Sequence, residues 1–201
     1  MALNFANNNS LSAITTKPSG LSGGAMNLIS TQTASSSSTI SFTSGIDSTY
    51  DEYVFKFYDI HPATNGSHFT FNGSIDSGSN YNVTKTTTWF FAYHNEADSQ
   101  AALTYSIYND LAQSTDFQIL ASDIGNENDE SASGEMFLYN PSSTTFVKHF
   151  ISQAHDYNSN DYANNMFCSG YLNTTSAINA VQFKMNSGNI DSGVIKLYGI
   201  S

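Results

Sequence analysis

The sequence contains no arginine, and its six basic residues are all lysines, against seventeen acidic residues. The formal net charge is −11. Binding to nucleic acid through phosphate neutralisation needs a basic face that is usually rich in arginine, so this composition argues against a nucleic-acid partner. An anionic membrane surface is disfavoured for the same reason. Neutral or basic protein surfaces, or glycans, are the partners that this charge favours.

Cysteine occurs once, as Cys168, so the chain cannot form an internal disulfide. Its neighbours Met166 and Phe167 are apolar, which is typical of a small core residue rather than a reactive thiol. The first ten residues lack the basic stretch and apolar segment of a signal peptide. No apolar run approaches the roughly 18 residues that span a bilayer. These absences predict synthesis and folding in a reducing cytoplasm.

Motifs of known catalytic chemistry are also missing. The five histidines are not spaced as metal ligands on one helix. The GxSxG pattern occurs once, over residues 20–24, but without the preceding strand pattern of a nucleophile elbow, and no phosphate-binding glycine loop precedes a helix. Pairs of carboxylates for glycoside hydrolysis meet only in the folded chain, so the sequence selects none. The residues alone therefore indicate no recognisable catalytic chemistry and no cofactor.

The densest acidic stretch runs over residues 123–130, around Asp129. Oxygen ligands at short spacing can hold Ca²⁺, and loops of β-sandwiches often do so. The order of these residues does not match the twelve-residue calcium loop, however. A solvated acidic loop is therefore the expectation, with a calcium site as the alternative.

Hydroxyl, amide and aromatic side chains are what the chain has in abundance. Serine, threonine and asparagine together exceed a third of the residues, and 14 Phe and 12 Tyr supply packable area that disordered chains lack. The length of 201 residues suits one sizeable β domain. We expect residues 25–201 to form a single domain, preceded by an extended N-terminal arm, residues 1–24.

The clearest strand pattern lies near the C-terminal end, where Val181, Phe183 and Met185 alternate with polar residues. A turn-rich stretch and a second apolar run, residues 194–200, follow it and predict a terminal hairpin. Residues 53–60 read as a core strand that His61 and Pro62 end. Residues 83–94 include a run of apolar and aromatic residues that predicts a central strand buried on both faces.

Shorter patterns complete the expected fold. Asn95 is a candidate cap for one helical turn through Leu103, and Ser35–Ser38 are expected to form a turn between two strands. Further strands are expected over residues 25–32, 39–43, 68–72, 104–108, 116–120, 134–140, 144–153 and 164–172. About ten short strands without helical crossovers exclude a parallel α/β sheet. They indicate an all-β fold, a jelly-roll-like antiparallel β-sandwich.

Two groups of side chains are candidates for contact with partners. In the arm, Phe5, Leu11 and Ile14 are too widely spaced to form a core, so we expect them to pack on the body or on a neighbouring subunit, with a frayed terminus as the alternative. Six tyrosines in or beside expected loops suit either sugar binding or subunit contacts. They are Tyr81, Tyr93, Tyr105, Tyr108, Tyr157 and Tyr162.

Several stretches resemble virion structural proteins of tailed bacteriophages, particularly marine ones. They are MALNFANNNSLSAIT, LISTQTASSSSTISFTSGI, YDEYVFKFYDIHPAT, YNVTKTTTWFFAYH, SASGEMFLYNPSSTTFVKHFI and the ending IKLYGI. The resemblance covers most of the chain and supplies no catalytic residues to transfer. It implies a non-enzymatic, oligomeric component of the virion, made in the host cytoplasm and in contact with other virion proteins and with copies of itself.

Two functions follow as expectations. The first is a structural accessory of the particle, as a capsid decoration, head fibre or tail component anchored by the arm. The alternative is a β-sandwich module that binds a carbohydrate or a receptor, including a host glycan. A hydrolase of host polysaccharide is a more distant third.

Overall fold

The computed structural model describes residues 25–201, which form twelve β-strands and no helix. The predicted arm, with Phe5, Leu11 and Ile14, lies outside the described residues. Within residues 25–201 there is accordingly no helix able to span a membrane. The strands are β1 (Met26–Ser37), β2 (Ile40–Phe42), β3 (Glu52–Pro62), β4 (Ser67–Ser74), β5 (Lys85–Asn95), β6 (Ala101–Tyr105), β7 (Gln118–Ile124), β8 (Ala132–Tyr139), β9 (Lys148–Asn158), β10 (Tyr162–Leu172), β11 (Ala180–Met185) and β12 (Ile190–Ile200).

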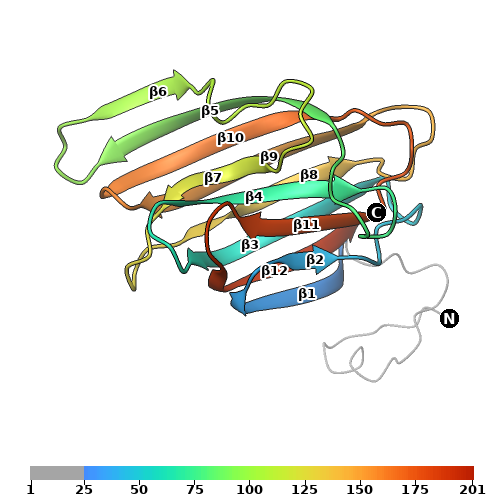
Figure 1. Cartoon of the computed structure of the whole chain (residues 1–201), viewed down its shortest axis with the longest axis horizontal. Coiled ribbons are helices and arrows are strands. Elements are labelled where there is room, and N and C mark those ends of the chain that lie inside the picture. The colour runs from blue at the N-terminus through green and yellow to red at the C-terminus, as the bar shows by residue number, and fades with distance from the viewer. Residues whose placement is uncertain (1–24) are drawn as a thin grey trace, which may run out of the picture.

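All neighbouring strands run antiparallel, and together they form one sheet that nearly closes into a barrel (Figure 1). One part has eight strands in the order β1-β12-β3-β8-β9-β10-β5-β6, and the other has four in the order β7-β4-β11-β2. A single residue pair, Ile124 with Asn158, joins the two parts. The short connection of residues 38–39 brings β1 and β2 together at the opposite side. The four-stranded part therefore faces the inside of the eight-stranded part.

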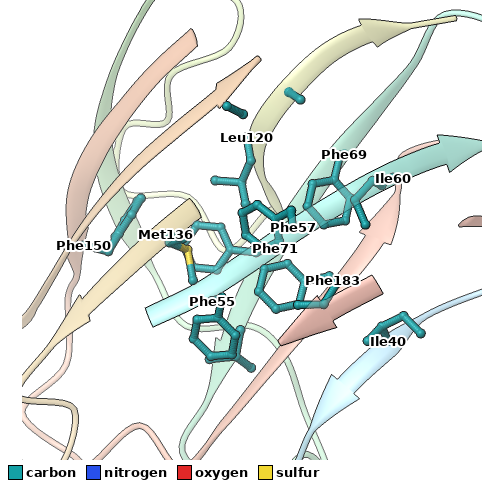
Figure 2. Packing of buried hydrophobic residues seen from close by; sticks show 14 of the residues in the cluster. Ile40, Phe55, Phe57, Ile60, Phe69, Phe71, Leu120, Met136, Phe150 and Phe183 are labelled. Atoms are coloured by element: carbon teal, nitrogen blue, oxygen red, sulfur yellow. The ribbon is translucent and has the colours of Figure 1, made fainter. Parts of the chain in front are cut away.

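Aromatic side chains fill the space between the two parts (Figure 2). Phe183 of β11 lies at the centre, with its ring 5.2 Å from that of Phe55 and 5.3 Å from that of Phe57, both on β3. On its own side of the core it stacks on Phe69 of β4 at 5.6 Å. Edge-to-face and offset aromatic pairs add about 0.5–1.5 kcal/mol each to the burial of their area. The predicted core strand β3 is thus confirmed, and Pro62 is its last residue.

The expected terminal hairpin is wrong. The strand β11 pairs with β4 and β2, whereas β12 pairs with β1 and β3. Residues 186–189 therefore connect the four-stranded part to the eight-stranded part. The alternation of Val181, Phe183 and Met185 fixes which face is buried, and Leu197 of β12 is buried in the same core. The same alternation of apolar and polar residues is expected whether two strands pair with each other or face each other across the core.

The expected helical turn is also wrong. Asn95 ends β5, and its side-chain Oδ1 accepts hydrogen bonds from the backbone N–H groups of Ser99 at 3.0 Å and Gln100 at 2.9 Å. These bonds close the loop of the β5–β6 hairpin, whereas a helix cap would accept from the N–H groups of residues 97 or 98. Asparagine makes such local bonds in turns as well as at helix ends. The residues from Ala101 onward then form β6 instead of continuing a helix.

Two smaller expectations also need correction. The strand β5 is second from the end of the eight-stranded part, and Phe90 is 40% exposed, so β5 is not buried on both faces. Most of the serine run, residues 35–37, lies inside β1. Of the two Asn-Gly pairs in the chain's first half, Asn65-Gly66 forms a turn, with Gly66 at a φ of 71°, whereas Asn72-Gly73 lies within β4.

Truncation of the central aromatic side chain should be costly. Replacement Phe183→Ala is expected to lower the free energy of unfolding by about 3–5 kcal/mol, because it leaves a cavity among at least four other aromatic rings. Urea unfolding followed by tryptophan fluorescence measures this through the shift of the midpoint. The matched control is Phe146→Ala, since Phe146 is 70% exposed, and it should change stability by less than about 0.5 kcal/mol. Equal losses in the two variants would contradict this account of the core.

Candidate binding groove

The four-stranded part does not cover the whole inner face of the eight-stranded part. Its outermost strand, β7, lies against β10, where the backbone N–H of Ser122 contacts the sulfur of Met166 at 3.3 Å. The strands β5 and β6 continue beyond this edge (Figure 1). An open groove of about 430 Å³ lies there. Its lining residues are His68, Phe91, Tyr93, Gln100, Ser106, Tyr108, Asn109, Ser122, Asp123, Asn158, Tyr162 and Asn164.

A row of aromatic side chains leads from the core into this groove. Trp89, Phe91 and Tyr93 alternate along β5 and so share its inner face. The ring centroids of Trp89 and Phe91 are 5.1 Å apart, and those of Phe91 and Tyr93 are 5.6 Å apart. Trp89 is fully buried, whereas Phe91 and Tyr93 are half-buried. The hydrophobic core therefore ends in partly exposed rings that form one wall of the groove.

Strand register places polar residues beside these rings. Tyr93 of β5 pairs with Asn164 of β10, and Tyr162 of β10 pairs with Asn158 of β9. The rings of Tyr93 and Tyr162 meet edge to face at 5.6 Å. The hydroxyl of Tyr162 donates a hydrogen bond of 2.7 Å to Oε1 of Gln100 in the β5–β6 loop. Amide and phenol groups thus surround the aromatic wall.

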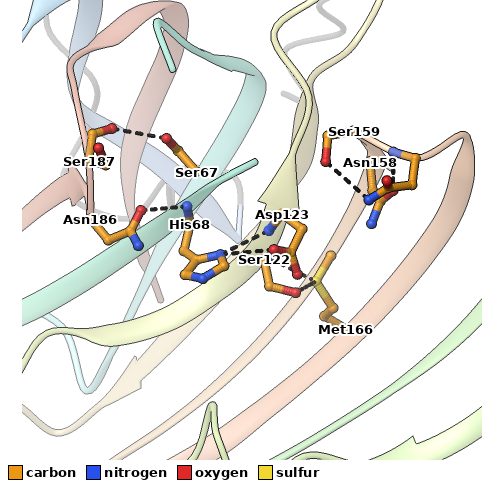
Figure 3. A network of polar contacts seen from close by, with 10 residues as sticks. Ser67, His68, Ser122, Asp123, Asn158, Ser159, Met166, Asn186 and Ser187 are labelled. Atoms are coloured by element: carbon orange, nitrogen blue, oxygen red, sulfur yellow. Dashed lines mark hydrogen bonds and ion pairs between the residues drawn. The ribbon is translucent and has the colours of Figure 1, made fainter. Parts of the chain in front are cut away.

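The opposite rim comes from β4 and β7 (Figure 3). The backbone N–H of Asp123 donates to Nδ1 of His68 at 2.9 Å, and the backbone N–H of His68 donates to the side chain of Asn186 at 2.8 Å. Through these two bonds His68 links Asp123 with Asn186. Asp123 adopts a left-handed backbone conformation with a φ of 58°. This turn of the backbone directs the end of β7 past the groove.

A buried carboxyl group lies next to the groove. Asp156 of β9 pairs with Asn164 of β10, so both side chains are on the inner face, and Asp156 is fully buried. Among residues 25–201, neither carboxyl oxygen of Asp156 has a hydrogen-bond partner. Burial raises the pKa of Asp156 to about 8; the amide of Asn164 lowers it, and the charges of Asp123 and Glu130 raise it further. Asp156 is therefore mainly protonated at neutral pH.

In the described part of the chain, no lysine lines the groove. Lys85 and Lys148 are fully buried, and Nζ of Lys85 donates to the backbone carbonyl of Asp116 at 2.5 Å. Burial lowers the pKa of Lys85 to about 8, while the charge of Asp116 raises it. Lys56 pairs with Glu135 at 2.7 Å on the outer face. The only carboxylate among the described residues that line the groove is that of Asp123.

The acidic stretch of residues 123–130 folds back on itself. Glu130 is only 5% exposed, and its Oε2 accepts a hydrogen bond of 2.6 Å from the backbone N–H of Glu127. In the part of the chain that the structure describes, no three His, Cys, Asp or Glu side chains are grouped so that they could hold a metal ion. The alternative of a calcium site therefore gains no support from the geometry.

Three of the six candidate tyrosines meet in the groove: Tyr93, Tyr108 and Tyr162. The other three lie elsewhere: Tyr81 lines a separate cavity near Lys184, Tyr105 donates a hydrogen bond to Asp110, and Tyr157 lies at the outer face of β9. Phe91 and Asn164 were not singled out from the sequence. Phe91 lies two residues before Tyr93, and Asn164 lies two residues after Tyr162. Residues i and i+2 of a strand share a face, so this spacing could have identified both as neighbours of candidate tyrosines. Cys168 is buried, as expected.

No protein-family model matches the chain, and no curated protein or solved structure shows significant similarity to it.

The buried acid should make stability depend on pH. The folded-state pKa of Asp156, about 8, lies above its ordinary value of 3.8, so the folded chain binds the extra proton between these pH values. Its contribution is fully present below about pH 4 and falls by up to about 1.4 kcal/mol per pH unit as the pH rises toward 8. Replacement Asp156→Asn is expected to flatten this decline and to stabilise the protein at pH 8.

Urea unfolding at intervals from pH 4 to pH 8 measures this effect. The exposed Asp129→Asn variant removes the same formal charge and should keep the wild-type slope. If Asp156→Asn unfolded with the same pH dependence as the wild type, Asp156 would be ionised or solvated in the folded protein.

Proposed function

We propose that this chain is a non-enzymatic surface protein of a phage particle and that its groove binds a glycan. The resemblance of the sequence to phage virion proteins supports the setting on a particle. The observation that supports glycan binding is the row of half-buried aromatic rings, Phe91 and Tyr93, beside the amide side chains of the groove. The structural role on the particle and the binding role are compatible in one protein.

The chemistry of the groove suits sugars. The C–H face of a pyranose ring packs on aromatic rings, and its hydroxyl groups exchange hydrogen bonds with amides and phenols. Phe91, Tyr93 and Tyr108 offer the rings, and Asn158 and Asn164 offer both donors and acceptors. The volume of about 430 Å³ lies in the range of small-molecule sites. An open groove of this size accommodates part of a longer oligosaccharide.

The charge of the groove restricts the class of sugar. Of the groove-lining residues within 25–201, Asp123 alone has a charged side chain and none is a lysine. Acidic sugars would meet a carboxylate with no compensating cation, at a cost that rises with desolvation. We therefore propose neutral sugars or amino sugars as the ligands.

A hydrolase is a weaker reading of the same groove. Glycoside hydrolysis normally uses two carboxyl groups on either side of the scissile bond. Among the described residues that line the groove, Asp123 is the only one with a carboxyl group. Asp156 lies near but is fully buried.

We extend the proposal to the architecture of the sheet. We take the eight-stranded and four-stranded parts as the two faces of a jelly-roll-like sandwich, with residues 1–24 as an arm. The single residue pair between β7 and β9 supports this division, because the two parts are otherwise separate ladders. The connection from β11 to β12 passes from one face to the other, as it does in sandwich folds.

Glycan binding can be tested with an array of neutral, amino and acidic oligosaccharides, followed by calorimetry on any hit. Binding is expected for neutral or amino sugars. Replacements Tyr93→Ala and Tyr162→Ala should each weaken it at least about tenfold, since each removes a ring worth roughly 1.4 kcal/mol or more. Tyr58→Ala, which removes an exposed tyrosine on the outer face, should leave it unchanged. No binding to any sugar, or full binding by both groove variants, would refute the glycan proposal.

The setting on a particle can be tested separately by quantitative mass spectrometry of purified virions. We expect the wild-type chain to be present and a variant lacking residues 2–24, which include Phe5, Leu11 and Ile14, to be lost, because the arm provides the anchor. Circular dichroism should show that the truncated chain keeps its β structure. Normal incorporation of the truncated chain would refute the anchoring role, and absence of the wild type from virions would refute the particle proposal.

A further inference from the structure

The eight-stranded part ends in a free edge at β6. This strand pairs only with β5, from Tyr105 opposite Phe90 to Ala101 opposite His94. Among the described residues, no other strand pairs with its outer side. All five residues of β6 are exposed. The outward backbone N–H and C=O groups of β6 are therefore available to another strand.

This edge has none of the usual features that prevent strand pairing. Residues 100–108 include no charged residue and no proline, and the β5–β6 ladder has no bulge. Natural edge strands are normally protected by charges, prolines or bulges. Exposed apolar side chains gather at the same place: Leu103 is 72% exposed, Ile107 69% and Tyr108 89%. Such a concentration marks an interaction surface.

We propose that β6 pairs with β6 of a second copy of this chain, antiparallel and about a two-fold axis at Leu103. In that register Leu103 faces its own copy, Ala101 faces Tyr105 and Ala102 faces Thr104. Ala101 thus lies opposite the larger Tyr105, the two Leu103 side chains meet, and no charged residues face each other. Two copies that each carry a net charge of −11 repel over most of their surface. A stretch of nine uncharged residues is where they approach at the lowest electrostatic cost.

The pairing has a consequence for binding that rests on the proposed glycan function. Gln100, next to β6, and Tyr93, on the neighbouring strand β5, line the groove. A dimer joined at β6 places one groove on each side of the joint and near it. Two sites held in one particle would bind a repeating surface glycan more tightly than either alone.

Analytical ultracentrifugation of the full chain over a range of concentrations tests the proposal. A monomer–dimer equilibrium is expected, and Leu103→Lys should weaken self-association at least about tenfold, because it places like charges opposite each other. Mixing the Leu103→Lys and Leu103→Glu chains should restore the dimer as a heterodimer. Ile151→Lys adds the same charge at an exposed apolar residue of β9 and should leave the dimer intact.

Several results would overturn the pairing: a wild-type monomer at all concentrations, a dimer that survives Leu103→Lys, or open-ended oligomers, which indicate a head-to-tail contact. Hydrogen exchange of wild-type β6 amides gives a test that needs no variant, since protection should rise with concentration. The monomeric Leu103→Lys chain should still bind a glycan in its one groove. A failure of the pairing and a failure of the glycan proposal are therefore distinguishable.

Discussion

The inward packing of aromatic rings around Phe183 is the interaction on which the rest of this structure depends. A single residue pair, Ile124 with Asn158, connects the two parts of the sheet through the backbone. Their attachment therefore comes mainly from side chains, with Phe183 of β11 packed against Phe55 and Phe57 of β3. Hydrophobic burial is not directional, so it can hold two ladders together without shared hydrogen bonds. The aromatic abundance of the sequence supplies the required area.

The groove is the place where this packing ends. The four-stranded part stops at β7, while the inner face of the eight-stranded part continues through β10 and β5. The row of Trp89, Phe91 and Tyr93 accordingly changes from fully buried to half-buried along one strand. Phe91 and Tyr93 stay partly exposed here because, among the described residues, no strand lies opposite them. The same unequal width of the two parts leaves the β6 edge free, so the proposed glycan site and the proposed dimer contact have one structural origin.

The burial of three ionisable groups lowers the stability of the fold. Asp156 is fully buried with no hydrogen-bond partner among the described residues, and Lys85 and Lys148 are buried against backbone carbonyls. Burial moves the pKa of each group toward its neutral form, upward for Asp156 and downward for both lysines. Asp156 pairs with Asn164, which lines the groove, so this acid lies beside the groove. Lys85 and Lys148 are buried, so they do not offset the acidic side chains on the surface.

The sequence by itself determined the all-β class, the core strand β3, the burial of Cys168 and the acidic surface, because alternation and composition are local properties that packing does not reverse. Only the tertiary structure decided which strands are neighbours. The pattern around Phe183 and Leu197 specifies buried faces but not partners, and β11 and β12 prove to lie in different parts of the sheet. Asn95 accepts its backbone hydrogen bonds in a hairpin loop and not at a helix start, because the residues that follow the loop pair with β5. The groove joins residues as distant in sequence as His68 and Tyr162, and their meeting depends on the unequal widths of the two parts of the sheet, which no local pattern encodes.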